Sequence, residues 1–460
     1  MFEFGRELRR LFGAEDSSVY RDGLTGGDAS LLELLDLRLL QQEAKAADVA
    51  AGRVSAKDPG QRRLEAATVW REFARRSGDV VALRKAAAAA ERAAELFDRD
   101  KRPDGWARAR CEQATCVMLG AELFGDQGLN AAASIAFRDA KHRSPGGLVQ
   151  ALAEVGTLAV EARIRLQDAD IETAMEINAR FDAPLAGLKA LTRRGREARL
   201  ILVEARMLRA DLLMGWGARL AHRELMSLAL AEIEIAGRDL DVEHEPLSWA
   251  RLATLRGQAI VLMGEISGSV EMAVEGVNVL TGTLDGLNRD DSPMDWARLQ
   301  AALGQGLQAI GEATASERAY EQAVTCYDRA MLVFRDIPAL AQSAVVTSNR
   351  ALCLARSAEL SGDLAVLDAA EAAFRIELTN LAPGRNPAAW AMLQVNLAKL
   401  YESRMEITGR DNGERVAATV ALSAALDVFS EQGLRSLSVL ASDALERLAR
   451  LGTAQTRPQF

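Results

Sequence analysis

A short signature, a proline followed three positions later by a tryptophan, recurs four times along this chain. The four copies are Pro103/Trp106, Pro246/Trp249, Pro293/Trp296 and Pro387/Trp390. The last three tryptophans are 47 and then 94 residues apart, so the second interval is twice the first. A fixed period in this range is typical of a solenoid, in which each repeat is one supersecondary unit whose apolar face is covered by its neighbours. The spacing therefore predicts an array of stacked repeats.

The pattern continues through repeats that lack the tryptophan. With the tryptophan as reference, the eight reference positions are Arg62, Trp106, Leu148, Glu197, Trp249, Trp296, Ser343 and Trp390. A small residue stands eight positions later in seven of the eight repeats, and an apolar residue stands eleven positions later. Offsets of eight and eleven share one helix face, which predicts a first helix whose small residues allow close packing.

Each first helix is expected to end at a break and to be followed by a second helix. Glycines mark the breaks in this interpretation, at Gly78, Gly125, Gly264, Gly311, Gly362 and from Gly409 to Gly413. The second helix is clearest over residues 317 to 334, with a stripe formed by Tyr320, Ala323, Tyr327, Ala330 and Phe334. Each repeat is therefore predicted to be a helical hairpin.

The composition agrees with an all-helical chain. The 460 residues exceed what one globular core usually supports, yet no Pro/Gly/Ser-rich linker divides them. Prolines are few, and the abundant Ala, Leu, Arg and Glu lose little conformational freedom in a helix. The net charge of -9 argues against a protein built to bind nucleic acid. We expect no secretory signal and no membrane-spanning segment, and hence a cytoplasmic protein.

The repeat resembles the tetratricopeptide (TPR) repeat in its longer bacterial form, which opens with Pro-x-x-Trp-Ala-Met-x-Gln-x-Asn-Leu-Gly. The closest matches are residues 387 to 398, through Trp390, Met392, Gln394 and Asn396, and residues 293 to 304, through Trp296, Gln300 and Gly304. The resemblance covers residues 59 to 436. It implies an all-α solenoid of about eight hairpins whose concave groove, lined by first helices, binds peptides or protein surfaces. It implies no catalytic activity.

We expect three segments along the chain. Residues 1 to 58 form N-terminal helices, residues 59 to 436 form the repeat array, and residues 437 to 460 form a C-terminal cap helix and tail. Helices are predicted over residues 29 to 51 and 434 to 451. Both are interpreted as caps, because the ends of an array need an outer face that tolerates water.

The first residues form a short basic amphipathic pattern. In a helix, one face would carry Phe4, Leu8, Leu11 and Phe12, and the other face would carry three arginines. One interpretation is a helix that contacts a membrane surface through these four apolar side chains. The alternative is a helix that packs on the array as an additional cap. We favour the cap, because the helix is short and two glutamates partly offset its arginines.

No motif for catalysis is found in the sequence. The cysteines lack the Cys-x-x-Cys spacing of metal sites and are interpreted as buried packing residues: Cys111, Cys116, Cys326 and Cys353. The histidines are too scattered for a zinc motif: His142, His222 and His244.

Two glycine pairs, Gly215/Gly217 and Gly304/Gly306, lack the strand and helix context of a nucleotide-binding loop. We interpret them as packing positions. Taken with the cysteines and histidines, they lead us to expect no enzyme, no cofactor and no metal site.

Two stretches of opposite charge lie close together in the sequence. Residues 189 to 209 carry seven basic and two acidic residues, a net charge of +5, and residues 232 to 245 carry six acidic residues. The basic residues are Lys189, Arg193, Arg194, Arg196, Arg199, Arg206 and Arg209. One hypothesis is a basic patch for an acidic partner. The alternative is that neighbouring helices exchange surface ion pairs, which are individually weak.

Polar residues recur at two offsets that, by the resemblance, face the groove. Two positions after the reference stand Arg108, Arg199, Arg251 and Arg298, and nine positions after it stand Gln258, Gln305 and Lys399. We expect these residues to contact a partner and the arginines to be exposed. The tryptophans are expected to be packing residues.

The leading hypothesis is a non-enzymatic scaffold or adaptor that holds a peptide segment of a partner protein in its groove. Groove arginines would favour a partner with an acidic or C-terminal carboxylate segment. One alternative is a peripheral membrane organiser attached through the N-terminal helix, with the array recruiting partners. Another alternative is a receptor for a signal peptide or small molecule that regulates an effector. The oligomeric state does not follow from the sequence.

Overall fold

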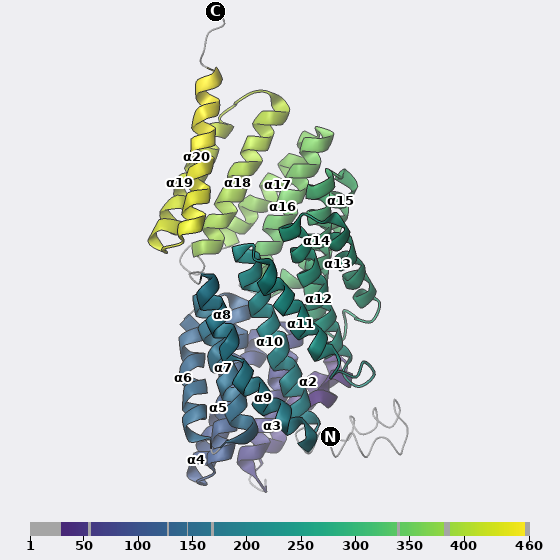
Figure 1. Ribbon diagram of the computed structural model, residues 1–460, viewed down its shortest axis with the longest axis vertical. Helices are drawn as coiled ribbons and strands as arrows, with labels where there is room; N and C mark the ends of the chain where they lie inside the picture. Colours follow the sequence, from purple (N-terminus) through teal and green to yellow (C-terminus); the bar gives the residue numbers. More distant parts are fainter. Residues whose placement is uncertain are drawn as a thin grey trace, which may run out of the picture. The chain divides into compact units, whose positions relative to one another are not determined.

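The protein is described by a computed structural model. The described residues are 29–53, 57–126, 128–144, 146–166, 170–337, 341–380 and 387–455. Within these ranges every regular element is a helix and none is a strand (Figure 1). From α2 to α13, and again from α15 to α20, consecutive helices pack against one another in chain order. The predicted all-α solenoid is confirmed.

The described helices form eight hairpins, each with a long first helix. The first helices are α3 (Pro59–Ser77), α5 (Pro103–Phe124), α7 (Gly147–Arg165), α10 (Arg196–Leu220), α12 (Pro246–Ser267), α14 (Pro293–Thr314), α16 (Ala341–Ser361) and α18 (Pro387–Thr408). The second helices are α4 (Val80–Arg99), α6 (Gly128–Arg143), α8 (Ile171–Arg180) with α9 (Asp182–Leu191), α11 (Arg223–Gly237), α13 (Val270–Leu284), α15 (Glu317–Phe334), α17 (Leu364–Asn380) and α19 (Glu414–Glu431). All eight predicted reference positions fall in the first turns of the first helices, so the predicted repeat is confirmed.

Further helices flank the hairpins. The predicted helix over residues 29 to 51 is two elements, the 3₁₀ helix η1 (Ala29–Leu34) and α2 (Leu37–Ala51), which packs on α3. The chain breaks between them because the Asp36 carboxylate caps α2, accepting a hydrogen bond of 2.6 Å from the Leu39 N–H. The predicted C-terminal helix is α20 (Arg435–Gln455), which packs on α19. A second short 3₁₀ helix, η2 (Thr192–Arg194), precedes α10.

Residue choice at the helix ends explains where the hairpins turn. Proline begins α3, α5 and α12, where its missing N–H would have no helical partner anyway. Asp79 caps the second helix α4 by accepting from the Val81 and Ala82 N–H groups. Gly78 and Gly125 end α3 and α5 with positive φ angles of 73° and 64°, which only glycine adopts at little cost.

Two of the predicted breaks are wrong. Gly264 and Gly311 lie inside α12 and α14, which continue to Ser267 and Thr314. A Cβ on Gly264 would lie 2.9 Å from the backbone nitrogen of Ala273, so glycine is required there by the close approach of α13. A glycine that ends a helix and a glycine that allows a neighbouring helix to approach look the same in the sequence.

The predicted small position eight residues after the reference is confirmed as a contact point. A Cβ on Gly156 would lie 2.4 Å from the Phe137 ring of α6, and one on Gly304 would lie 2.6 Å from the Tyr327 ring of α15. Each glycine therefore receives an aromatic ring from a neighbouring second helix. The stripe predicted on residues 317 to 334 is buried in α15 as expected.

The second helix of the third hairpin is interrupted at Phe181, between α8 and α9. Pro184 follows three residues later and has no N–H to donate to the Arg180 carbonyl, so a single straight helix is interrupted. Phe181 itself is buried in the core between α7 and α10. The third repeat therefore has two short second helices in place of one.

The signature tryptophans are packing residues. Trp106 and Trp390 are half-buried and pack against the apolar cores of their hairpins. Trp249 and Trp296 are also half-buried, and the Arg289 guanidinium lies 5.6 Å from the centre of the Trp296 ring. The predicted packing role is therefore confirmed for Trp106 and Trp390, whose indoles are partly and not fully buried.

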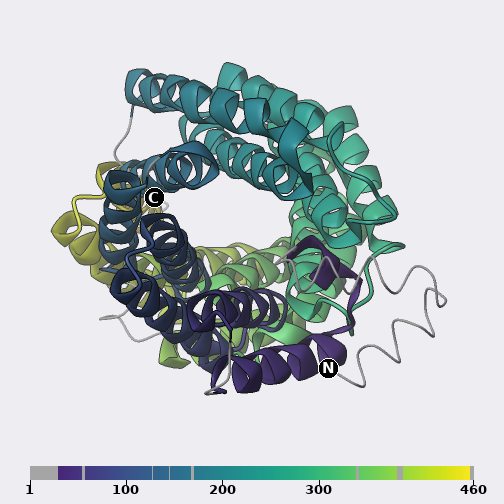
Figure 2. The same cartoon turned by 90° about the horizontal axis from the view of Figure 1, so that it is seen from below.

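The chain divides into two compact units, the first ending at Leu299 and the second beginning at Gln300. The division falls inside α14. In the first unit the helices from α3 (purple in Figure 2) to α12 (teal) follow a curve that brings α12 back to the start, where η1 packs on both α3 and α12. In the second unit α15 to α20 stack in chain order. The predicted boundaries at residues 58 and 436 stay a prediction.

Candidate binding surfaces

The first helices of the first unit are joined by ion pairs between repeats far apart in the sequence. Arg75 of α3 pairs with Glu204 of α10 at 3.1 Å. Arg108 of α5 pairs with Glu197 of α10. Two further pairs, Arg251–Glu72 and Arg298–Glu122, join α12 to α3 and α14 to α5. The curve of this unit therefore brings acids and bases of distant first helices together.

Each predicted groove arginine has an acidic partner within the chain. Arg298 contacts Glu122 at 2.8 Å, and Arg199 contacts Glu245 at 2.5 Å. Arg251 lies between Asp295, at 2.8 Å, and Glu72, at 3.2 Å, and its side chain is only 8% exposed. The expectation that these arginines are exposed is wrong for Arg251. The reason is that α3 and α14 supply carboxylates which no local pattern around Arg251 reveals.

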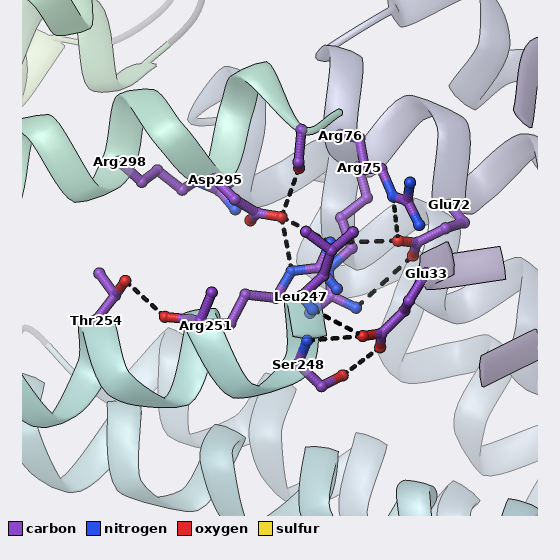
Figure 3. Close-up of polar contacts among 12 residues, drawn as sticks. Glu33, Glu72, Arg75, Arg76, Leu247, Ser248, Arg251, Thr254, Asp295 and Arg298 are labelled. Carbon is purple, nitrogen blue, oxygen red and sulfur yellow. Dashed lines mark hydrogen bonds and ion pairs between the residues drawn. The ribbon is translucent and has the colours of Figure 1, made fainter. Parts of the chain in front are cut away.

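A buried charge cluster surrounds Arg251 (Figure 3). Burial opposes the ionisation of Glu72, but Arg251, Arg76 and Arg75 outweigh it and hold the pKa of Glu72 well below its usual range. Burial also opposes ionisation of Asp295, yet Arg251 lowers its pKa. The Ser292 hydroxyl donates to Asp295 at 2.7 Å. Both carboxylates are therefore ionised and paired in the interior.

Arg76 links this cluster to the N-terminal 3₁₀ helix. Its guanidinium is fully buried and donates to Glu72 at 2.9 Å. It also donates to the carbonyls of Leu32, at 2.6 Å, and Leu35, at 2.7 Å. This buried arginine thus donates three hydrogen bonds, one to a carboxylate and two to backbone carbonyls of η1 and of the residue after it.

Glu33 of η1 occupies the N-terminus of α12. Its carboxylate accepts hydrogen bonds from the N–H groups of Leu247, at 3.0 Å, and Ser248, at 2.8 Å, and from the Ser248 hydroxyl. Burial raises the pKa of Glu33, while Arg251 and the Ser248 bonds act in the opposite direction. The helix N-terminus favours a negative charge at this place. No sequence pattern indicated this contact, which spans more than 200 residues.

A second charged group lies on α5, α7, α10 and the start of α14. Glu122 accepts from Arg163 at 3.3 Å and from Arg298 at 2.8 Å. Burial opposes the ionisation of Glu122, but these two arginines lower its pKa. The surrounding protein raises the pKa of nearby Asp211, and the Glu122 charge adds to the rise. This group of first-helix residues therefore carries charges of both signs.

The basic stretch at residues 189 to 209 pairs largely with the acidic stretch that follows it. Arg206 and Arg209 contact Glu232 at 2.6 and 3.1 Å. Arg196 and Arg199 contact Glu245 at 3.1 and 2.5 Å. For these four arginines the ion-pair alternative is confirmed. Several of the pairs are buried rather than on the surface, since Glu245 is fully covered.

The second unit carries three cations on successive first helices and the C-terminal helix, which we name the cation row: Arg356 of α16, Lys399 of α18 and Arg447 of α20. Arg356 contacts Glu359 at 2.5 Å, and Arg447 contacts Glu402 at 3.6 Å. Among the described residues the Lys399 ammonium makes no ion pair. Burial lowers the pKa of Lys399, and the positive charges of Arg356 and Arg447 lower it further, against a smaller opposing effect of Glu402 and Glu312.

The other predicted contact residues lie on first helices. Gln258 is half-buried in α12, in the first unit, and Gln305 is half-buried in α14, in the second. Arg356 and Arg447 were not predicted, because they stand outside the offsets that the repeat motif defines.

All four cysteines are free and buried, as predicted. Burial raises the pKa of the Cys111 and Cys353 thiols to about 12. His222 caps α11, its Nδ1 accepting from the Leu225 N–H at 3.4 Å, and His244 contacts Asp241 at 2.7 Å. In the described ranges no three metal-ligating side chains form a group that could hold an ion.

One glycine of each pair, Gly217 and Gly304, is a packing position, as predicted. A Cβ on Gly217 would lie 2.6 Å from the Met226 sulfur, and Gly304 receives the Tyr327 ring.

The residues predicted for membrane contact, Phe4, Leu8, Leu11 and Phe12, lie outside the described residues. Over the described part of the chain no helix combines the length and apolar character needed to cross a bilayer.

No family model matches the sequence, and no curated protein matches it. Among solved structures the chain is similar to a Rap protein in complex with the competence and sporulation factor, with 11% identity and a TM-score of 0.49 over 85% of this chain and 98% of that one. It is similar to a circular tandem repeat protein at 14% identity and a TM-score of 0.27, covering 92% and 97%. A monomeric mutant of IFIT1 with m7Gppp-AAAA gives 12% identity and a TM-score of 0.33, covering 92% and 90%. These values are too low to assign a family, so the fold is established by the described helices.

Proposed function

We propose that this protein is a TPR-type scaffold that binds an extended peptide segment of a partner protein along the first helices of its second unit. The partner segment carries an acidic side chain or a C-terminal carboxylate. In this proposal the protein acts by binding and positioning its partner, and it performs no chemistry of its own.

The observation that carries the proposal is the unpaired Lys399 in the cation row. Every predicted groove arginine of the first unit already has a carboxylate partner within the chain. Lys399 has none among the described residues, and the positive charges of Arg356 and Arg447 repel its ammonium. A carboxylate supplied by a partner would relieve that repulsion and form a charge-assisted hydrogen bond.

The residue at the equivalent position of another repeat suits an extended peptide. Gln305 occupies on α14 the same offset as Lys399 on α18, so the repeat presents an amide and an ammonium at equivalent positions. An amide side chain can donate to and accept from a peptide backbone, while the cation row fixes the acidic end. Arg108, Arg199, Arg251 and Arg298 are proposed to hold the first unit together instead of contacting the partner.

The test is peptide binding measured by fluorescence anisotropy. Labelled peptides of one sequence with a free or amidated C-terminus, and with or without acidic side chains, are titrated with the full chain. Lys399→Ala should weaken binding of the acidic or free-carboxylate peptide about 10-fold, as expected for loss of one charge-assisted hydrogen bond. It should leave the neutral amidated peptide unaffected.

Arg410→Ala is the matched control, because Arg410 is an exposed cation of the same unit outside the cation row. It should change neither affinity. Equal affinities of wild type and Lys399→Ala for every peptide would refute a carboxylate site at the cation row. A pull-down from lysate with both proteins would then identify which partner, if any, depends on Lys399.

A further inference from the structure

The segment formed by residues 32 to 35, Leu-Glu-Leu-Leu, is held by the first unit as a ligand is held. Leu32 and Leu35 are 1% and 3% exposed, so both side chains are seated in the protein. The hydrogen bonds of this segment with α12 join residues more than 200 positions apart. It therefore docks onto a surface that other parts of the chain build.

One half of that surface receives a carboxylate. The Leu247 and Ser248 N–H groups and the Ser248 hydroxyl all donate to Glu33. Ser248 is itself 6% exposed, and the positive Arg251 lies close enough to favour the ionised Glu33. Two backbone donors and one hydroxyl bind the carboxylate, and the Arg251 charge attracts it, which together partly offset the burial that raises the pKa of Glu33.

The other half receives a peptide backbone. The fully buried Arg76 donates to the Leu32 and Leu35 carbonyls on either side of Glu33. Glu72 fixes both receptor arginines, since it accepts from Arg76 at 2.9 Å and from Arg251 at 3.2 Å. The receptor groups are thus held in place by interactions among themselves, independently of the docked segment (Figure 3).

We propose that Arg76, Leu247, Ser248 and Arg251 form a binding site for a short peptide of the pattern Leu-Glu-x-Leu, which the chain's own residues 32 to 35 occupy in this structure. A partner protein carrying that pattern replaces the internal segment. The partner supplies one carboxylate, two carbonyls and two leucine side chains, so it forms the same hydrogen bonds and fills the same apolar positions. This site is separate from the cation row and does not depend on it.

The internal segment has the advantage of being tethered, because a short tether gives an effective concentration on the order of millimolar. A partner peptide therefore competes poorly against the intact segment and well against a weakened one. The partner gains access when its local concentration is high or when it also binds elsewhere on the scaffold. The internal segment then acts as a competitor that determines the partner concentration needed for binding.

The test uses a fluorescently labelled peptide with the sequence of residues 29 to 36, ASLLELLD, and anisotropy as readout. The receptor is the full chain, either wild type or carrying Leu32→Ala with Glu33→Gln to weaken the internal segment. The double variant should bind the peptide at least 10-fold more tightly than wild type. A peptide with Gln in place of the glutamate should bind the double variant about 10-fold more weakly, and adding Ser248→Ala should weaken binding about 5-fold.

Two results would overturn the proposal. A double variant that melts as wild type does, but fails to bind the peptide at millimolar concentration, would show that the segment is a fixed part of the core. Equal binding to wild type and double variant would place the peptide elsewhere. Lys399→Ala should leave the affinity for this peptide unchanged. The proposal for the Leu-Glu-x-Leu site can therefore fail independently of the proposal for the cation row.

Should the double variant not fold, hydrogen exchange on the wild-type chain decides between the two possibilities. Exchangeable binding requires the amides of residues 32 to 35 to exchange at least 10-fold faster than those in the middle of α3, because the segment must leave without unfolding of the unit. Exchange of both regions at one common rate would show that the segment leaves only when the unit unfolds, and would overturn the proposal.

Discussion

The two units use the same hairpin repeat but distribute their charges differently. In the first unit, ion pairs connect residues 89, 129, 176 and 179 positions apart, because the curve of the unit brings distant first helices together. In the described part of the second unit, ion pairs join residues on the same or nearby helices, such as Arg350 with Asp328 and Arg404 with Glu371. The repeat motif therefore determines where the helices lie, while the charges at its variable positions determine whether ion pairs join distant first helices.

The largest difference in stability between the two units is expected from a substitution at Arg251. Replacing it by Ala leaves Glu72 and Asp295 buried without their main partner, which should cost roughly 3 to 5 kcal/mol of unfolding free energy. Urea unfolding followed by tryptophan fluorescence is a suitable measurement, because five of the six tryptophans lie in the first unit.

Arg350→Ala in the second unit is the matched control. Its pair with Asp328 is partly exposed, at 25% and 53% of the two side chains, and should contribute less than about 1 kcal/mol. Similar losses for Arg251→Ala and Arg350→Ala would mean that the pairs between distant repeats do not distinguish the units.

Acid should affect the first unit more than the second. Glu72 and Asp295 have lowered pKa values in the folded state, so their contribution to stability is complete above the unfolded pKa of about 4 and is lost as the pH falls through the folded values. Burial raises the pKa of Glu377 and Glu402 in the second unit, and proton uptake there favours the folded state. Burial also raises the pKa of Glu33 in the first unit, so its proton uptake favours the folded state and reduces the difference in acid sensitivity between the two units.

We expect the first unit to lose roughly 2 kcal/mol more than the second between pH 5 and pH 3, because protonation of Glu72 and Asp295 removes their buried ion pairs. Fluorescence reports mainly the first unit, and far-UV circular dichroism reports all helices. The fluorescence midpoint in urea should therefore fall faster with acid than the dichroism midpoint. Coincident midpoints at both pH values would contradict the prediction.

The smallest expected effect concerns Arg108. Its pair with Glu197 also joins distant repeats, but the two side chains are 39% and 41% exposed. Water and salt screen such a pair, so Arg108→Ala should cost less than about 1 kcal/mol, and less still in about 0.5 M salt. A loss as large as that of Arg251→Ala would show that distance along the chain, and not burial, determines the strength of these pairs.

The sequence predicted what the local period controls. The eight first helices begin where the reference positions indicated, and the small residues at Gly156 and Gly304 receive aromatic rings as expected. The period could not tell a glycine that ends a helix from one that admits a neighbouring helix, which is why the breaks predicted at Gly264 and Gly311 were wrong. Both signals come from the same missing Cβ.

The candidate sites were less predictable, because they depend on the curvature of the first unit. The partners of Arg251 lie 44 residues ahead and 179 residues behind, and nothing near Arg251 in the sequence indicates that both carboxylates meet there. Glu33 was likewise hidden in a helix interpreted only as a cap. Lys399 was recognised because its offset belongs to the repeat motif itself.

The alkylation rates of the buried cysteines report which unit unfolds first. Cys111 and Cys116 lie in the first unit, and Cys326 and Cys353 lie in the second. A thiol whose pKa is about 12 has almost no thiolate at neutral pH and reacts slowly with an alkylating reagent until its helix opens and water enters. Brief alkylation followed by peptide mass analysis would therefore measure the opening rate of each unit separately, with no label added to the natural chain.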